Sequence, residues 1–229
     1  MRKTISIVIP VFNEEENLRE FYTRLTKVMS EVSYDYDIIF VDDGSRDASS
    51  AILYDLSQND EHVQAYLLSR NFGHQMALTC GLDHAEGDAV ITMDGDLQHP
   101  PELIPELLGL WEAGYEIVQT VRKDTADASK FKKITSSTYY KLVNKMSKVH
   151  ITPGGSDFRL MDRVAIEALR LYNERARFIR GLVNNLGFKL TTLEFVAPPR
   201  FAVQSKYNLH KMLHFALDGI TAFSNVPLR

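Results

Sequence analysis

The chain has 229 residues, of which 45% are hydrophobic and 24% are charged, and its formal net charge at pH 7 is −4. This balance is typical of a folded soluble protein with a full core, and it gives no reason to expect a nucleic-acid partner. The single cysteine excludes an internal disulfide and fits a reducing compartment, and no stretch reaches the roughly 18 consecutive apolar residues of a membrane span.

Strand and helix patterns alternate along the first two-thirds of the chain. Apolar and β-branched runs predict strands at Thr4–Val11, Asp37–Val41, Val63–Leu68, Ala89–Met93 and Glu116–Thr120. Helices are predicted between them at Glu15–Val32, with Asn13 as its N-cap, and at Ala48–Ser57, His74–His84 and Glu102–Ala113. Elements that alternate at this spacing form βαβ units, so we expect an α/β fold with a parallel sheet.

The pattern loosens after Thr120. The expected elements are a helix at Lys130–Val149, a Gly/Pro loop at Thr152–Ser156, a short strand at Asp157–Met161, a helix at Arg163–Leu171 capped by Asp162, a helix at Phe178–Leu186 and an edge strand at Lys189–Val196. The sequence contains no internal repeat, linker or low-complexity tract. We therefore expect one compact domain.

The segment from Arg122 to Lys148 is rich in basic residues. They are Arg122, Lys123, Lys130, Lys132, Lys133, Lys141, Lys145 and Lys148, against the acidic Asp124 and Asp127. The last three lysines fall at helical spacing, so a solvated helix face would explain them. A basic surface that faces phosphate groups is the alternative. The segment alone does not decide between the two.

An apolar stripe at helical spacing lies near the end of the chain. Its members are Leu209, Met212, Leu213, Ala216, Leu217 and Ile220. Such a stripe most often packs on the core of its own domain, and a helix that lies on a membrane surface is the less common alternative.

Three polar clusters follow three of the predicted strands. They are Asn13-Glu14, Asp42-Asp43 and the pair Asp94 and Asp96. The carboxyl ends of parallel strands form the ligand-binding edge of an open α/β sheet. Carboxylates gathered there repel one another unless donors or cations compensate them. A nucleotide with its metal ion would supply those partners.

Asp94 and Asp96 come directly after the apolar run Ala89–Met93. Residues two apart in an extended segment point the same way, so both carboxylates are expected to face one ligand. Together with the Gln98 carbonyl they are hard oxygen donors that suit Mg²⁺ or Mn²⁺ carrying a phosphate group. A plain surface turn is the alternative for an isolated Asp-Gly-Asp, but the other polar strand ends favour the metal site.

Several motifs resemble those of the family 2 glycosyltransferases. They are VIPVFNEE at 8–15, VDDGS at 41–45, RNFG at 70–73 and MDGDLQHPPE at 93–102. More narrowly, the chain is similar to the polyprenyl-phosphate glycosyltransferases, the group that contains dolichol-phosphate mannose synthase and the bactoprenol glucosyltransferases. The later motifs GSDFRLM at 155–161, SKY at 205–207, ITAFS at 220–224 and PLR at 227–229 resemble the bactoprenol-linked branch.

The resemblance implies a GT-A fold, which is a mostly parallel sheet flanked by helices, and an inverting, metal-dependent transfer of a sugar. The donor would be a UDP-sugar, with glucose or N-acetylglucosamine as the sugar. The acceptor would be a polyprenyl phosphate such as undecaprenyl phosphate, at the cytoplasmic face of the cell membrane. We also expect a homo-oligomer.

The resemblance also implies roles for individual residues. The donor-binding residues would be Pro10, Phe12, Glu14 and Asp42 at the base, Asp94 near the ribose, and Asp43 and Lys206. The metal ligands would be Asp96 and Gln98, and the acceptor phosphate would bind Arg122, Lys132 and Lys133. Asp157 would join Arg122 and Asp96 as a catalytic residue by orienting sugar hydroxyls or the acceptor. The acceptor is already an anion, so a strong general base is not required.

Two departures from the family affect the end of the chain. Relatives usually carry a glycine before the Ser205-Lys206 pair, where this chain has Val203. Relatives also continue past a Pro-Leu-Arg sequence into membrane helices, and we expect the natural protein to do the same. The expected division is a catalytic domain at 1–200, followed at 201–229 by a loop and an amphipathic, membrane-proximal helix.

Three other functions fit parts of the pattern. A phosphatase of the haloacid dehalogenase type also places Asp-x-Asp after a strand, but it offers no use for Asp42 and Asp43. A sugar nucleotidyltransferase would open with a glycine-rich loop after the first strand, where this chain has Phe12 and Asn13. The non-enzyme alternative is a catalytically idle subunit that binds nucleotide sugars.

Overall fold

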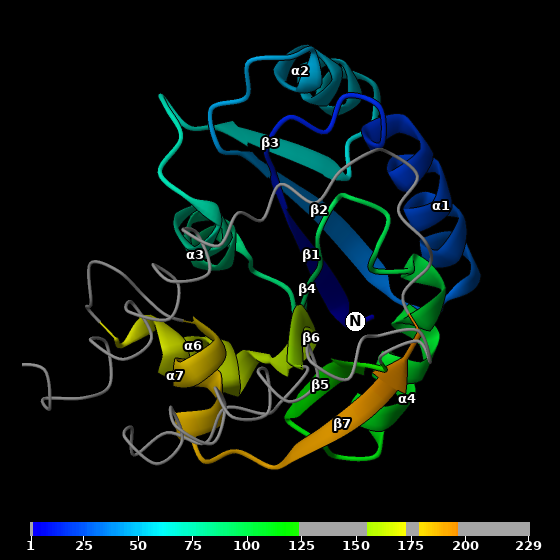
Figure 1. The fold of residues 1–229 in the computed structure, drawn as a ribbon. Coiled ribbons are helices and arrows are strands. Elements are labelled where there is room, and N and C mark those ends of the chain that lie inside the picture. Colours follow the sequence, from blue (N-terminus) through cyan, green and yellow to red (C-terminus); the bar gives the residue numbers. More distant parts are fainter. Residues whose placement is uncertain (1, 124–154, 173–178, 197–229) are drawn as a thin grey trace, which may run out of the picture.

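In the computed structural model, which describes residues 2–123, 155–172 and 179–196, seven strands form one sheet in the order β3-β2-β1-β4-β6-β5-β7 (Figure 1). The strands are β1 Thr4–Val11, β2 Asp35–Asp42, β3 Val63–Leu67, β4 Ala89–Thr92, β5 Ile117–Arg122, β6 Gly155–Asp162 and β7 Leu190–Phe195. Neighbouring strands pair in parallel, except that β6 runs antiparallel between β4 and β5. The sheet is therefore mostly parallel.

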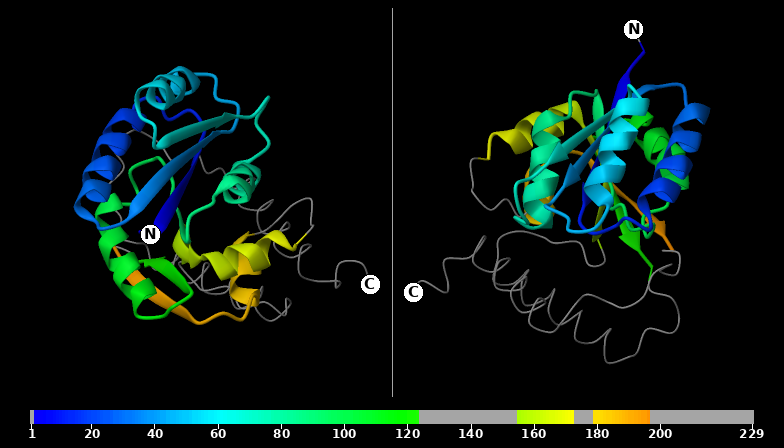
Figure 2. Two further views of the ribbon diagram at one scale, coloured as in Figure 1. Left: turned by 180° about the vertical axis from the view of Figure 1, so that it is seen from behind. Right: turned by 90° about the horizontal axis from the view of Figure 1, so that it is seen from above.

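Helices cover both faces of this sheet (Figures 1 and 2). They are α1 Leu18–Glu31, α2 Ser49–Asn59, α3 His74–His84, the 3-10 turn η1 Pro101–Leu103, α4 Ile104–Glu112, α6 Arg163–Arg170 and α7 Ile179–Asn185. Phe21 of α1 and Leu107 of α4 belong to the buried cluster on one face. Leu78 of α3 and Leu182 of α7 belong to the cluster on the other. The sheet is therefore buried between two layers of helices.

Strand β1 lies inside the sheet, between β2 and β4. Successive side chains of a strand point to opposite faces, so Ile7 joins the α1 layer and Val8 the α3 layer. The strand order reverses beside β1, because β2 lies on one side of it and β4 on the other. Ligands of open α/β sheets bind at such a reversal, beyond the carboxyl ends of the strands. The carboxyl ends of β1, β2 and β4 meet the amino end of β6 at this edge.

The structure confirms most of the predicted elements and corrects two. Strand β7 lies at the edge of the sheet, and the Asp162 carboxylate caps α6 by accepting a hydrogen bond from Val164 N at 2.9 Å. Asn13 is not the cap of α1, which begins at Leu18, because Asn13 adopts a φ of 54° and its side chain turns toward Arg46. Strand β6 begins inside the predicted Gly/Pro loop, because Gly155 already pairs with Val121 of β5.

Several expectations concern residues outside the described ranges. They are the helix at Lys130–Val149, the amphipathic helix at Leu209–Ile220, the Val203 position and the division at residue 200. Within the ranges that the structure describes, no helix is both long enough and apolar enough to cross a membrane.

Candidate active site

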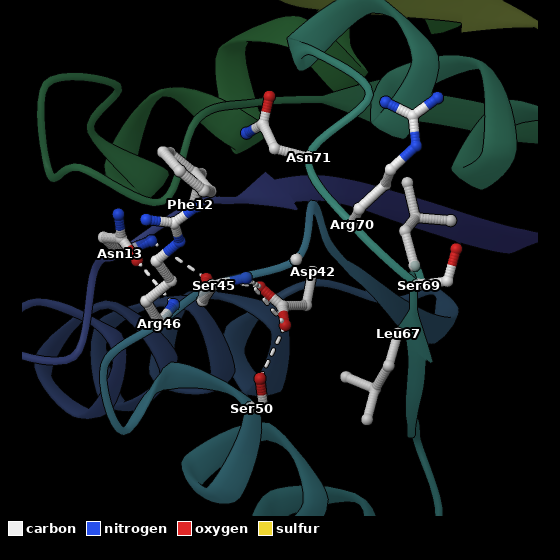
Figure 3. Close-up of a pocket in the computed structure, with 12 residues that line it drawn as sticks. Phe12, Asn13, Asp42, Ser45, Arg46, Ser50, Leu67, Ser69, Arg70 and Asn71 are labelled. Carbon is white, nitrogen blue, oxygen red and sulfur yellow. Dashed lines mark hydrogen bonds between the residues drawn. The ribbon is translucent and has the colours of Figure 1, made fainter.

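A pocket of about 510 Å³ opens at the carboxyl ends of β1, β2 and β3 (Figure 3). It is lined by Phe12, Asn13, Asp42, Gly44, Ser45, Arg46, Ser50, Leu67, Leu68, Ser69, Arg70 and Asn71. We call it the Phe12 pocket. Its volume falls within the range of small-molecule sites, and an aromatic ring beside convergent polar groups suits a flat heterocycle with N–H and carbonyl groups.

Asp42 is the buried acceptor of this pocket. Ser45 donates to it through its backbone N at 3.1 Å and also through its hydroxyl, and the Ser50 hydroxyl donates at 2.6 Å. Figure 3 shows these bonds between Asp42 and the Ser45 and Ser50 side chains within the pocket that Phe12 also lines. Asp42 is thereby fixed as an oriented acceptor at the end of β2. The prediction that Phe12 and Asp42 share one site is consistent with this geometry.

The neighbouring carboxylate, Asp43, supports the wall of the pocket. Its oxygens accept hydrogen bonds from the backbone N atoms of Phe72 at 2.7 Å and Gly73 at 2.9 Å. Pro10 lies buried within β1 and Glu14 accepts a hydrogen bond from the Asn17 side chain at 2.7 Å, and neither lines the Phe12 pocket. The expectation that these carboxylates lack partners until a nucleotide binds is wrong, because the chain itself supplies their donors.

Gly44 lets the turn after β2 touch the loop after β3. Its φ is 69°, and a Cβ at this position would lie 2.4 Å from the carbonyl carbon of Arg70 and 2.6 Å from the backbone N of Asn71. We expect Gly44→Ala to lower the free energy of unfolding by more than about 1 kcal/mol, through strain in the left-handed region and the backbone clash. It should also weaken nucleotide binding, because Arg70 and Asn71 form the pocket wall.

Thermal melting and nucleotide titration of Gly44→Ala test this prediction. Gly109→Ala is the matched control, because Gly109 lies in α4 and an alanine methyl group there would meet nothing within 4 Å among the described residues. At this position alanine should leave stability equal or raise it by about 0.5–1 kcal/mol. If Gly44→Ala melts like the wild type, close approach of the two loops does not define the pocket.

A cluster of ionic side chains lies beside the carboxyl end of β4, and we call it the ionic cluster. Its members are His74, Asp94, Asp157, Arg159 and Arg180. His74 Nε2 lies 2.8 Å from Asp94 Oδ1, and His74 Nδ1 lies 3.9 Å from Asp157 Oδ2. The imidazole therefore links the end of β4 with the start of β6.

The pKa of His74 reflects these two carboxylates. Burial lowers it, but the hydrogen bond to Asp94 and the charges of Asp94 and Asp157 outweigh burial and raise it from 6.5 to about 9. Stability from the imidazolium is fully present below the unfolded pKa of 6.5 and is lost as pH rises through 9. Its size is modest, because 42% of the side chain is exposed and solvent screens the pair.

We therefore expect wild type to exceed His74→Gln in unfolding free energy below pH 6.5, with an advantage that shrinks as pH rises through about 9. Urea unfolding of both proteins across this range measures the difference. An advantage that grows toward high pH would contradict the assignment of a charged imidazole to this cluster.

Asp157 is the buried centre of the ionic cluster. Arg180 donates to its two oxygens, from Nε at 2.9 Å and from Nη2 at 2.8 Å, and Arg159 Nη2 donates at 2.9 Å. Burial raises the pKa of the Asp157 carboxyl, but the two guanidinium groups outweigh burial and hold the pKa well below its usual range. Asp157 is thus a carboxylate held between two arginines.

The acidic loop after β4 differs from its prediction. Strand β4 ends at Thr92 and Leu97 has a φ of 62°, so Asp94 and Asp96 do not continue an extended segment. Asp94 contacts His74, whereas the Oδ1 atom of Asp96 accepts a hydrogen bond from Gln98 N at 3.0 Å. The two carboxylates therefore have separate partners within the chain, and the expectation that they continue an extended segment is wrong. That both face one ligand stays a prediction.

Arg122 reaches this loop from the end of β5. Its Nη1 atom donates to Gln98 Oε1 at 3.1 Å. The predicted metal ligands Asp96 and Gln98 and the predicted phosphate-binding Arg122 are therefore neighbours, although they come from different strands. The other predicted phosphate- and donor-binding residues, Lys132, Lys133 and Lys206, lie outside the described residues.

The oxygen donors of Asp96 and Gln98 fit a Mg²⁺ or Mn²⁺ ion. Both are hard ligands, and Asp96 is only partly buried, so water and phosphate oxygens can complete an octahedral shell. Among the residues that the structure describes, no group of three or more His, Cys, Asp or Glu side chains is placed to hold a metal by itself. A carboxylate–amide pair with substrate oxygens is the arrangement that fits this loop.

Comparison with known proteins decides the family. The family described as "Glycosyl transferase family 2" matches residues 6–170. The chain belongs to this family. The family 2 assignment confirms the resemblance and the glycosyltransferase class, and it removes the phosphatase and nucleotidyltransferase alternatives.

Individual relatives extend this result. A Bacillus subtilis (strain 168) protein named "Uncharacterized glycosyltransferase YkcC" is 45% identical over 98% of this chain and 69% of its own length. The "Bactoprenol glucosyl transferase" of Shigella phage SfV is 42% identical over 98% of this chain and 73% of its own length. Both similarities span nearly the whole of this family 2 chain.

The fold also matches solved structures. One of them is glucosyl-3-phosphoglycerate synthase from Mycobacterium tuberculosis, in complex with Mn²⁺, uridine diphosphate and glucosyl-3-phosphoglycerate. It superposes on this chain with a TM-score of 0.63 at 17% sequence identity. The superposition covers 95% of this chain and 77% of that one. This likeness confirms the GT-A fold of the family 2 chain.

Sequence reasoning missed several residues of the site. His74, Arg159 and Arg180 join Asp157 from α3, β6 and α7, and Ser45 and Ser50 orient Asp42. The available signal was position: His74 directly follows the RNFG motif, and Arg159 belongs to the GSDFRLM motif. Arg180 carried no comparable signal.

Proposed function

We propose that this family 2 glycosyltransferase transfers a sugar, with inversion, from a UDP-sugar to a polyprenyl phosphate. The observation that carries this proposal is one sheet edge holding the Phe12 pocket and, beside it, the group formed by Asp96, Gln98 and Arg122. The first suits a nucleoside, and the second suits a diphosphate with its metal ion next to an acceptor phosphate.

The donor would place its base in the Phe12 pocket. Phe12 would contact the ring, and the oriented Asp42 carboxylate would accept a hydrogen bond from a base N–H group. Asp94 would lie near the ribose. Uridine is favoured by the complex of the Mycobacterium tuberculosis relative with uridine diphosphate, and glucose by the names of the bactoprenol glucosyl transferases. N-acetylglucosamine is the other proposed sugar.

Asp96 and Gln98 would hold Mg²⁺ or Mn²⁺, which when bound supplies positive charge to the leaving diphosphate. Arg122 would hold the acceptor phosphate with a planar fork suited to its oxygens. One phosphate oxygen attacks C1 of the sugar, a new C1–O bond forms on the face opposite the diphosphate, and UDP leaves with the electrons of the broken bond. No proton has to be removed from the acceptor. The rate acceleration would therefore come from positioning the two substrates and from stabilising the charge that develops on the diphosphate.

The proposed acceptor also indicates where in the cell the enzyme would work. A polyprenyl phosphate lies in the membrane, so we propose that the enzyme works at the cytoplasmic face of the cell membrane. The segment 201–229, with its apolar stripe and with Lys206, would lie near the bilayer, and Lys132 and Lys133 would assist Arg122. A homo-oligomer is also part of the proposal.

Calorimetric titration with UDP and GDP in the presence of Mn²⁺ tests the donor assignment. We expect UDP to bind, GDP to bind at least about tenfold more weakly, and Asp42→Ala to lose UDP affinity. Preferential binding of GDP would contradict the proposal. An idle binding subunit would bind UDP-glucose without ever hydrolysing or transferring it, so a Mn²⁺-dependent release of UDP from UDP-glucose separates the enzyme from that alternative.

A further inference from the structure

We propose that Thr120 is a positioning residue for sugar transfer, because it holds an irregular part of β6 that fixes the acidic loop after β4. The acidic loop comprises residues 94–98. The inference rests on the proposed function, in which Asp94 lies near the ribose and Asp96 and Gln98 hold the metal ion.

Strand β6 is irregular where it passes Thr120. The register of the β5–β6 ladder shifts between two pairs, Gln119 with Arg159 and Val121 with Gly155. One residue of β5, Thr120, therefore lies opposite three residues of β6, which we call the β6 bulge. They are Ser156, Asp157 and Phe158. Irregular strand segments of this kind redirect side chains and are common beside active sites.

Thr120 joins the two ends of the β6 bulge through its hydroxyl group. This hydroxyl donates to the carbonyl oxygen of Phe158 at 2.6 Å, so the 2.7 Å bond between Thr120 and Ser156 must have the Ser156 hydroxyl as its donor. The Ser156 oxygen in turn accepts a hydrogen bond from the backbone N of Phe158 at 3.1 Å. Two hydroxyl groups therefore hold both backbone groups of Phe158, and the Thr120 side chain is buried.

Buried side chains also hold the other two carbonyl groups of the β6 bulge. Gln119 Nε2 donates to the carbonyl oxygen of Ser156, and the Thr92 hydroxyl donates to that of Asp157. Gln119 and Thr92 belong to the neighbouring strands β5 and β4, and both are buried. All three carbonyl oxygens of the bulge thus accept hydrogen bonds from side chains. Removing such a buried donor leaves a carbonyl group unpaired and lets the bulge shift.

The β6 bulge supports the acidic loop from two directions. Phe158 stacks on His99 with ring centroids 5.3 Å apart, and His99 Nδ1 accepts a hydrogen bond from the backbone N of Asp94 at 2.8 Å. Asp157 Oδ2 lies 3.9 Å from His74 Nδ1, and His74 Nε2 lies 2.8 Å from Asp94 Oδ1. The backbone and the side chain of Asp94 are therefore linked, each through one histidine, to two consecutive residues of the bulge.

The position of Asp94 sets the position of the residues that follow it. Asp96 Oδ1 accepts a hydrogen bond from Gln98 N at 3.0 Å, so the two proposed metal ligands form one turn of the loop that Asp94 begins. A displacement of Asp94 would therefore displace the groups that would hold the ribose and the metal ion. Misplacement by about 1 Å can slow an enzyme about 100-fold. Thr120 thus acts on the reaction through the position of this loop.

Two substitutions of Thr120 test the proposal. Valine keeps the shape of the side chain and removes the hydroxyl, whereas serine keeps the hydroxyl. We expect Thr120→Val to lower kcat/KM for transfer from UDP-glucose to undecaprenyl phosphate in micelles about 10- to 100-fold. It should also weaken Mn²⁺ binding in the presence of UDP, measured by electron paramagnetic resonance, at least about fivefold. Thr120→Ser should stay within about threefold of wild type in both measurements.

Ser156→Ala gives a second route to the same ring of hydrogen bonds. It should lower transfer and Mn²⁺ affinity in the same direction, because it removes the hydroxyl that bonds both Thr120 and Phe158 N. The double variant with Thr120→Val should lie within about threefold of the poorer single variant, since both changes break one ring. If Thr120→Val does not fold, Ser156→Ala provides the comparison with wild type.

Ser6→Ala is the matched control for lost stability. The Ser6 hydroxyl is also buried, donates to Asp37 Oδ1 at 2.8 Å and accepts a hydrogen bond from Gly87 N at 2.8 Å. Ser6 lies near the amino end of β1, whereas the proposed site lies beyond the carboxyl ends of the strands. Ser6→Ala should melt earlier than wild type and keep kcat/KM and Mn²⁺ affinity within about twofold.

Several results would overturn the proposal. They are wild-type transfer and Mn²⁺ affinity in Thr120→Val or in Ser156→Ala, a loss in Thr120→Ser as large as in Thr120→Val, multiplicative losses in the double variant, and equal losses in Ser6→Ala. If wild type makes no lipid-linked sugar, the proposed function fails, and the Mn²⁺ affinities of the same variants still decide the role of Thr120. A wild type that binds no Mn²⁺ in the presence of UDP would overturn both.

Discussion

Asp96→Asn is expected to lower the rate of sugar transfer at least about 100-fold while changing the melting temperature by no more than about 2 °C. Asparagine keeps an oxygen that can accept the hydrogen bond from Gln98 N, which measures 3.0 Å, so the local turn should survive. What the substitution removes is the negative charge that would hold the metal ion against the diphosphate. Turnover with saturating Mg²⁺ or Mn²⁺ and a thermal melt measure the two effects separately.

The matched control for this substitution is Asp55→Asn. Asp55 is an exposed aspartate of α2 that pairs with Arg19 of α1 at 3.1 Å, and it does not line the Phe12 pocket. Its loss should leave turnover unchanged and cost less than about 1 kcal/mol of stability. Near-normal activity of Asp96→Asn at saturating metal would remove Asp96 from the metal site.

Arg122→Ala is expected to raise the KM for the polyprenyl phosphate about 10- to 100-fold, because a charge-assisted guanidinium–phosphate bond contributes about 1.5–3 kcal/mol. The affinity for UDP should stay within about threefold of wild type, since Arg122 contacts the side chain of Gln98 rather than the Phe12 pocket. Kinetics with varied lipid and a separate UDP titration without lipid give the two quantities.

Arg19→Ala is the control for Arg122→Ala, because it removes an exposed arginine of α1 that pairs with Asp55 and does not line the Phe12 pocket. It should change neither quantity. An equal loss of UDP affinity in Arg122→Ala, measured without lipid, would assign the guanidinium to the donor diphosphate.

The fold was predictable because its signals are local. The β-branched run Thr4–Val11 became β1 with its predicted bounds, and His74–His84 became α3. The pattern of apolar residues in these two segments agrees with the side chains that are buried in the structure. The failures were also local in cause: Asn13 and Leu97 adopt positive φ values, which redirect the chain after β1 and β4, and a sequence pattern does not show where a non-glycine residue will do this.

The site was predictable only where its residues follow the strands directly. Phe12 and Asp42 line one pocket because parallel strands end together, and this rule follows from topology. The ionic cluster escaped prediction because Arg180 stands 23 residues from Asp157, on a helix that tertiary packing alone brings over β6. For Asp43, the motif position did not reveal that its oxygens accept hydrogen bonds from backbone amides. Its role in donor binding stays a prediction.

The most direct test of the proposed function is transfer of radiolabelled glucose from UDP-glucose to undecaprenyl phosphate by this protein in micelles with Mn²⁺. We predict that label enters the lipid fraction as a glucosyl phospholipid, that UDP appears in equal amount, and that omission of the lipid phosphate or the metal abolishes both. Parallel reactions with UDP-N-acetylglucosamine identify the sugar. Absence of labelled lipid with both UDP-sugars, or transfer from a GDP-sugar instead, would contradict the proposed function.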